Sequence, residues 1–146
     1  MYKKILVPLD GSQLAECTLR HAESLALAYD STVILFSAIS PADIVGRAPA
    51  NVTAFDETID AHRTKVENYL KKVRDALTSK MIEAETHIGV EPVVKEIIET
   101  AETHDVDLVL IASHGRSGLG RVFFGSVASG VLNKIERPLM VIHPAS

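Results

Sequence analysis

Residues 106–126 read VDLVLIASHGRSGLGRVFFGS, and this stretch decides the fold of the chain. Its first part, residues 106–111, is an apolar run that predicts a strand buried on both faces. A glycine-rich segment follows and ends at Gly125 and Ser126, where a helical pattern begins. Glycine lets a backbone approach a ligand closely, arginine supplies charge and a planar set of donors, and a helix start offers free N–H groups. A strand, such a loop and a helix in this order favour a site for an anion, above all a phosphate chain.

The rest of the chain repeats this alternation of strands and helices. Residues 5–9, 32–36, 84–88 and 138–142 predict four more strands. A helix is expected after Ser12 as N-cap, a long one carries Phe55 to Leu77 on one face, and another has Pro92 as its first residue. We therefore expect an α/β fold, a doubly wound five-stranded parallel sheet with helices on both faces. Residues 84–88 and the strand that Pro138 opens are expected at edges, and residues 40–51 predict a mobile surface loop.

Length and composition limit the classes of function. The chain has 146 residues, a net charge of −4 and no basic run, so we expect a single domain, residues 1–146, without nucleic-acid binding. Cys17 is the one cysteine, which excludes an internal disulfide. No signal-peptide core and no apolar segment of about 20 residues occurs. These observations predict a cytoplasmic protein that is not membrane-embedded.

The carboxyl ends of the first and fourth strands should flank the ligand site, because open α/β sheets bind ligands where the strand order reverses. The first strand is followed by Asp10-Gly11-Ser12, and the fourth by Ala112 to Gly115. The segments match neither the P-loop nor the dinucleotide-binding pattern G-x-G-x-x-G. A receiver-type signalling domain is also unsupported, since no aspartate follows the third strand.

The glycine loop resembles that of the universal stress protein family, whose ATP-binding members carry G-x2-G-x9-G-[ST] here. Gly115, nine residues, and then Gly125 and Ser126 match its second part, whereas Ala112 stands at the first glycine. The resemblance runs from KILVPLDGS near the start to RPLMVI near the end. It implies an adenine nucleotide alpha hydrolase-like sheet with strand order 3-2-1-4-5.

The resemblance also implies an ATP site, with magnesium or manganese accompanying the nucleotide. Pro8 and Asp10 would lie against adenine and ribose, and Ala38 would contribute backbone contacts to adenine. Asp10 or Ser126 would be the protein contact to nucleotide-bound magnesium. The full set of expected nucleotide-binding residues is Pro8, Asp10, Ala38, Ala112, Ser113, His114, Gly115, Arg116, Ser117, Gly118, Arg121, Gly125, Ser126, Val127 and Ala128.

Each of these residues also has a purely structural interpretation. The glycines could form a plain surface loop, Arg116 and Arg121 could be solvated charges, and Asp10 could only shape a turn. His114 favours a structural hydrogen bond over acid–base chemistry, and Cys17 favours packing over nucleophilic chemistry. No Ser–His–Asp arrangement is evident for Ser113 or Ser126, so no catalytic residue is expected.

Three functions remain open at this point. The first is a cytoplasmic stress-response regulator or sensor that holds ATP without efficient turnover, since no positioned base and phosphate-site lysine are evident. The second is a slow ATPase using Asp10 or His114. The third is a nucleotide-free interaction module acting on a partner protein. The short apolar last strand, together with the resemblance, suggests a homodimer paired through that strand, with higher oligomers as an extension.

Overall fold

The computed structural model describes residues 1–39, 52–114 and 125–144, and the side chains of 52–55 are not among them. Its elements, in chain order, are β1 (Lys4–Pro8), α1 (Gln13–Glu16), α2 (Leu19–Tyr29), β2 (Thr32–Ile39), α4 (Val52–Thr78), β3 (Ala84–Val90), α5 (Val93–Thr103), β4 (Leu108–Ala112), α6 (Ser126–Lys134) and β5 (Leu139–Ile142). The expected loop over residues 40–51 lies outside the described residues.

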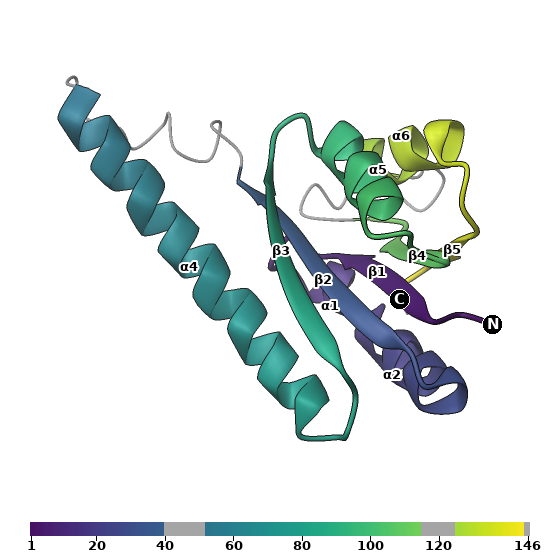
Figure 1. Ribbon diagram of the computed structural model, residues 1–146. Helices are drawn as coiled ribbons and strands as arrows, with labels where there is room; N and C mark the ends of the chain where they lie inside the picture. The colour runs from purple at the N-terminus through teal and green to yellow at the C-terminus, as the bar shows by residue number, and fades with distance from the viewer. Residues whose placement is uncertain (40–51, 115–124, 145–146) are drawn as a thin grey trace.

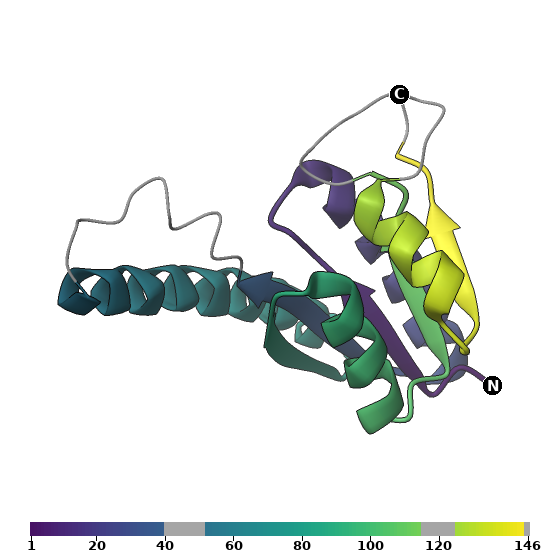
Figure 2. The same ribbon diagram turned by 90° about the horizontal axis from the view of Figure 1, so that it is seen from above.

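The five strands form one parallel sheet in the order β3-β2-β1-β4-β5, which confirms the expected fold class and order. Figure 1 shows β1 at the centre of the sheet, with α2 and α4 on one side and α5 and α6 on the other. The turned view in Figure 2 shows the same division of the helices. Both predicted edge strands, β3 and β5, lie at the edges.

The alternation of side chains along the central strands builds a core on each face of the sheet. Ile5 and Val7 of β1 pack with residues of α2 and α4, whereas Leu6 between them packs with α5 and α6. The same division separates Leu110 from Ile111 in β4. Every residue of β4 is buried, as expected for a parallel strand covered on both faces.

Several predicted strand ends are shifted by one to three residues, and three further differences have a local reason. The helix expected to run on from Ser12 is two helices, because Thr18 directs both its N–H and its hydroxyl to the carbonyl of Ala15 (3.3 and 2.8 Å). Pro92 is the N-cap of α5 and not its first helical residue, with φ −74° and ψ 129°. The fourth strand begins at Leu108, since Asp107 turns to accept hydrogen bonds from the N-terminal segment.

Candidate functional site

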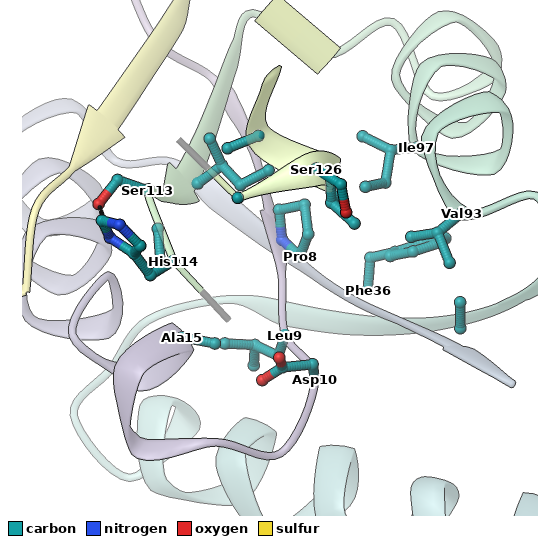
Figure 3. Close-up of a pocket in the computed structure, with 16 residues that line it drawn as sticks. Pro8, Leu9, Asp10, Ala15, Phe36, Val93, Ile97, Ser113, His114 and Ser126 are labelled. Carbon is teal, nitrogen blue, oxygen red and sulfur yellow. Dashed lines mark hydrogen bonds between the residues drawn. The ribbon is translucent and has the colours of Figure 1, made fainter. Parts of the chain in front are cut away.

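The strand order reverses between β1 and β4, and a cavity of about 310 Å³ opens at their carboxyl ends (Figure 3). Chain connections leave β1 toward β2 and leave β4 toward β5, so the two strand ends diverge and leave a crevice. A cavity of this volume is at the lower end of the range of small-molecule sites. It is lined by Pro8, Leu9, Asp10, Ala15, Phe36, Ala38, Val93, Ile97, Ile111, Ala112, Ser113, His114, Gly125, Ser126, Val127 and Ala128.

A tight turn after β1 holds the carboxylate of Asp10 at this cavity. Oδ1 of Asp10 accepts hydrogen bonds from the N–H and the Oγ–H of Ser12, at 2.9 and 2.5 Å. The same Oγ of Ser12 accepts from the N–H of Ala15 at 3.1 Å and so caps α1. Gly11 between them has φ +83°, a conformation that side chains other than glycine rarely adopt. Asp10 therefore shapes the turn, as its structural interpretation proposed, and also lines the cavity.

The backbone of Ser113 joins the end of β4 to both β5 and α6. Its N–H donates to the carbonyl of Ile142 at 2.9 Å, and its carbonyl accepts from the N–H of Gly125 at 2.6 Å. These two bonds place the start of α6 beside the end of β4, although eleven residues separate Ser113 from Gly125 in the sequence. The Oγ of Ser113, which is fully buried, lies 2.9 Å from Nδ1 of His114. His114 thus makes the structural hydrogen bond expected of it.

The amino end of α6 faces the same cavity with its amide groups. Gly125 is the N-cap and has no side chain that could cap the helix. The first amide to bond within the helix is that of Ser129, which donates to the carbonyl of Gly125 at 2.9 Å. The N–H groups of Ser126, Val127 and Ala128 precede it and have no acceptor within the helix. A helix start of this kind carries partial positive charge and favours an anion.

One side of the cavity is apolar. Figure 3 shows Phe36, Val93 and Ile97 gathered at one side of the cavity, with Ser113 and His114 at the other. Phe36 comes from β2, and Val93 and Ile97 stand four residues apart on one face of α5. One side of the cavity therefore suits a flat apolar group of a ligand, and the other side suits a charged or polar group.

Ten predicted site residues line the cavity and five lie outside the described residues. Those lining it are Pro8, Asp10, Ala38, Ala112, Ser113, His114, Gly125, Ser126, Val127 and Ala128. Those outside the description are Gly115, Arg116, Ser117, Gly118 and Arg121.

Sequence reasoning missed six lining residues: Leu9, Ala15, Phe36, Val93, Ile97 and Ile111. All are apolar, so composition gives them no mark that differs from the core. Spacing could have indicated some of them. Phe36 lies two residues before Ala38 and so on the same face of a strand, and Val93 and Ile97 lie four residues apart on one face of a helix.

The side chains whose pKa is displaced do not line the cavity. Burial raises the pKa of the Cys17 thiol, and Cys17 packs against the core as expected. Burial, and then a hydrogen bond of 2.8 Å to Glu16 Oε1, raises the pKa of Tyr69. Burial, followed by the neighbouring His104, lowers the pKa of His87, against an opposing effect of Glu96. Displaced pKa values often mark catalytic sites, but these three have a packing origin.

The described residues hold neither a membrane-spanning helix nor a cluster of metal-binding side chains. No helix in residues 1–39, 52–114 and 125–144 is both long enough and apolar enough to cross a bilayer. The same part of the chain holds no group of three or more histidine, cysteine, aspartate or glutamate side chains suited to a metal ion.

Comparison with known proteins agrees with this architecture. The model of the universal stress protein family matches residues 1–143. Universal stress protein MJ0577 of Methanocaldococcus jannaschii is 29% identical, over 97% of this chain and 95% of that protein. Its solved structure superposes with a TM-score of 0.88 and 27% identity, covering 100% of this chain and 99% of the other.

Two solved structures share the fold and were determined with nucleotides. A universal stress protein in complex with cAMP has a TM-score of 0.71 and 19% identity, covering 97% of both chains. The universal stress protein from Archaeoglobus fulgidus in complex with dAMP has a TM-score of 0.68 and 24% identity, covering 97% of this chain and 98% of the other. The sheet order and the crevice at its switch point agree with the family model. The chain belongs to the universal stress protein family, because the family model matches residues 1–143.

Proposed function

We propose that this protein binds ATP in the cavity between β1 and β4 and acts as a nucleotide-dependent regulator or sensor of the stress response. The observation that carries the proposal is the make-up of that cavity. Phe36, Val93 and Ile97 form an apolar side, Ser113 and His114 lie at the other side, and the amino end of α6 and Asp10 also line the cavity. An adenine nucleotide has the matching parts: a flat base, a sugar with hydroxyl donors, and an anionic chain.

Each part of the nucleotide has a proposed neighbour. The base would lie at the apolar end near Pro8 and Ala38, and the ribose would donate to Asp10. The phosphates would accept from the amides of Ser126, Val127 and Ala128. Gly115, Arg116, Ser117, Gly118 and Arg121 would complete the phosphate site, with Ala112, Ser113, His114 and Gly125 forming its wall.

Magnesium or manganese would accompany the nucleotide. Asp10 and Ser126 both line the cavity and carry oxygen, the ligand atom that magnesium prefers. Because the cavity supplies one carboxylate and one such hydroxyl from these two residues, the phosphate oxygens would provide most of the ligands. Removing the metal should therefore weaken ATP more than AMP.

The fold neighbours described with cAMP and dAMP support the choice of ligand class, since both ligands are adenine nucleotides. An estimate of affinity agrees with this choice. Hydrogen bonds to a charged group contribute about 1.5–3 kcal/mol each. Four or five of them, less the cost of association, would leave roughly −8 kcal/mol, a micromolar dissociation constant.

The proposed activity is binding without efficient hydrolysis. Helix amides hold a phosphate chain in its ground state, whereas acceleration needs interactions that strengthen in the transition state and an oriented water. The carboxylate of Asp10 already accepts two hydrogen bonds from Ser12, which suits a positioning role better than that of a base. We expect turnover below the range of roughly 1–100 s⁻¹ that is typical of kinases.

The setting proposed for this activity is a cytoplasmic homodimer of single-domain chains that regulates a partner protein. β5 is an edge strand whose Leu139, Met140 and Val141 are only half-buried, and Leu132 on the neighbouring α6 is exposed. Pairing with β5 of a second copy would cover this apolar edge. Light scattering at micromolar concentration should give the mass of a dimer, and a monomeric mass would contradict the pairing.

Calorimetry with ATP and magnesium tests the central proposal. We expect a micromolar dissociation constant and a thermal unfolding midpoint that rises with ATP concentration by mass action. Mass spectrometry of the small molecule that co-purifies identifies the natural ligand, and a steady-state phosphate-release assay separates the regulator from the slow ATPase. Absence of both heat and stabilisation at millimolar ATP would show that the protein is a nucleotide-free module.

A further inference from the structure

The apolar end of the cavity is closed by one aromatic ring whose position depends on a glycine outside the cavity. The ring belongs to Phe36, which is 1% exposed and lines the cavity. Gly89 on the neighbouring strand β3 is buried and does not line it. A Cβ built on Gly89 would lie 2.9 Å from both Cε2 and Cζ of Phe36, and 2.9 Å from Oε2 of Glu96. Carbon atoms do not approach so closely, so the ring occupies the space that the missing side chain leaves.

The backbone of Phe36 is held from both sides. Its register partners are Pro8 in β1 and His87 in β3, and its carbonyl accepts from the N–H of Leu9 at 2.7 Å. Because these bonds fix the strand, only the side chain of Phe36 can adjust to a ligand. The ring is the movable part of an otherwise rigid wall.

The ring has no room to retreat from the cavity. His87 stacks on it with ring centroids 6.0 Å apart and planes 20° apart, and His87 is itself in contact with His104 at 5.5 Å. Gly89 lies beside the ring edge formed by Cε2 and Cζ, and the carboxylate end of Glu96 lies near the same glycine. A bulky group that enters the apolar end would have to compress this stack, since protein interiors are close-packed.

We infer that Phe36 is the size-determining residue of this cavity and that Gly89 is a positioning residue that acts through it. The pair restricts the apolar end to a flat ring system without a bulky substituent on the edge that meets Phe36. This inference rests on the proposed function and adds its selectivity. The site should bind unsubstituted adenine nucleotides more tightly than adenine nucleotides with a substituted base.

Two single variants change the space at the apolar end in opposite ways: one removes the ring and the other crowds it. Phe36→Leu removes the ring and enlarges the apolar end while keeping an apolar side chain in the core. Gly89→Ala adds a Cβ that collides with the ring of Phe36 and with Oε2 of Glu96, so these side chains must shift. The φ of Gly89 is not in the left-handed region, so alanine brings no backbone strain. The double variant removes both ring atoms with which the new Cβ collides, Cε2 and Cζ, and leaves the contact with Oε2 of Glu96 in place.

The probes are ATP and two analogues with bulky base substituents, N6-benzyl-ATP and 8-bromo-ATP, whose substituents lie on different edges of adenine. For the wild-type protein we expect at least one analogue to bind 10-fold or more weakly than ATP. Phe36→Leu should reduce that discrimination at least 5-fold. Gly89→Ala should weaken ATP itself at least 5-fold, and this loss should disappear when Phe36→Leu is also present.

A second glycine supplies the matched control. A Cβ on Gly130 of α6 would lie 2.7 Å from Cγ2 of Val94 in α5, so Gly130→Ala strains the packing of two helices without a contact to Phe36. The effects of Gly130→Ala and Phe36→Leu on ATP affinity should be additive. Gly130→Ala alone should leave the discrimination between ATP and the two analogues as in wild type. Thermal unfolding of each variant shows that it is folded.

The outcomes separate the inference from the function on which it rests. Equal discrimination in wild type and Phe36→Leu, or a loss from Gly89→Ala that persists in the double variant, would overturn the inference while ATP binding stands. No binding of ATP to the wild-type protein would overturn the proposed function and the inference with it.

Discussion

The two ends of the sheet treat their polar backbone groups in different ways. At the amino ends, the chain satisfies its own groups: Oδ2 of Asp107 accepts from the N–H of Lys3 and Lys4 at 2.7 and 2.8 Å, and the N–H of Asp107 donates to Lys4. At the carboxyl ends, β1 and β4 diverge around a cavity, and the first amides of α6 lack acceptors in their helix. At the amino ends of these strands the backbone groups are hydrogen-bonded within the chain, whereas the carboxyl ends of β1 and β4 border the cavity.

The difference separates stability from binding. Changes at the amino ends should lower the free energy of unfolding and leave ligand affinity unchanged. Changes at the carboxyl ends should lower ligand affinity and leave the free energy of unfolding nearly unchanged, because polar groups kept for a ligand contribute little to the stability of the unliganded fold. For variants of Gly125 and of Asp107, both the free energy of unfolding and the ATP affinity are to be measured, so that either half of this comparison can fail.

The largest effect is expected for Gly125→Val at the carboxyl end. Gly125 has φ −55° and ψ 156°, which valine can adopt, so its role is close approach to the ligand and not an unusual backbone conformation. A β-branched side chain at this cavity-lining position would cover the amide groups of α6. We expect ATP affinity to fall at least about 100-fold, close to 3 kcal/mol, as measured by calorimetry.

Circular dichroism and urea unfolding provide the control for Gly125→Val. The free energy of unfolding should change by about 1 kcal/mol or less, the scale of a helix N-cap. Gly125→Ala should have an intermediate effect on affinity. Affinity retained in both variants would mean that the start of α6 does not meet the ligand.

At the amino end, Asp107→Ala is expected to lower stability by about 1–3 kcal/mol, since two backbone amides lose a charged acceptor. The two N–H groups are exposed enough to find water, which places the loss at the lower part of that range. ATP affinity should stay within twofold of wild type. An affinity loss larger than the stability loss would show that the two ends of the sheet are coupled.

The sheet was predictable from sequence because its signals are local and repeated. Short apolar runs marked β1 and β4 as strands, and the run at β4 indicated burial on both faces, while the polar alternation of β3 and Pro138 before β5 marked the edges. The break between α1 and α2 was not predictable in this way. It depends on the hydroxyl of Thr18 competing for one carbonyl, and threonine does not do so in every helix.

The candidate site was predictable only in its polar half. Asp10, Ser113 and Gly125 stand out as polar or glycine residues directly after apolar runs. Phe36 and Ile97 belong to the same apolar cluster as Leu6 and Val109, which do not line the cavity. Which apolar side chains meet the cavity and which meet each other depends on the divergence of β1 from β4, a property of the assembled sheet.

A smaller effect is expected from His87, which lies between the two ends and stacks on Phe36. Because its folded pKa is below the ordinary 6.5, the unfolded chain binds a proton before the folded chain does as pH falls. The stability contributed by neutral His87 is therefore present above pH 6.5 and is lost as pH falls from there toward the folded pKa.

Urea unfolding between pH 5 and pH 8 measures this effect. His87→Gln should make the free energy of unfolding less dependent on pH below 6.5. His104→Gln should raise the pKa of His87 by removing its charged neighbour, which NMR titration of the ring would detect. A His87→Gln variant with the wild-type pH dependence would assign the acid loss of stability to other groups.

The smallest effect is expected for the ion pair between Arg137 and Asp105 at the amino end. Nη1 of Arg137 lies 2.9 Å from Oδ1 of Asp105, but the Asp105 side chain is 84% exposed, so water and salt screen the attraction. Arg137→Ala should cost about 0.5 kcal/mol or less, and the loss should shrink further at 1 M salt. Asp105 has φ +50°, which asparagine tolerates, so Asp105→Asn removes the charge without new backbone strain and should match Arg137→Ala. A loss above about 1.5 kcal/mol in Arg137→Ala but not in Asp105→Asn would mean that the second bond of Arg137, to the carbonyl of Val106, stabilises this end of the sheet together with Asp107.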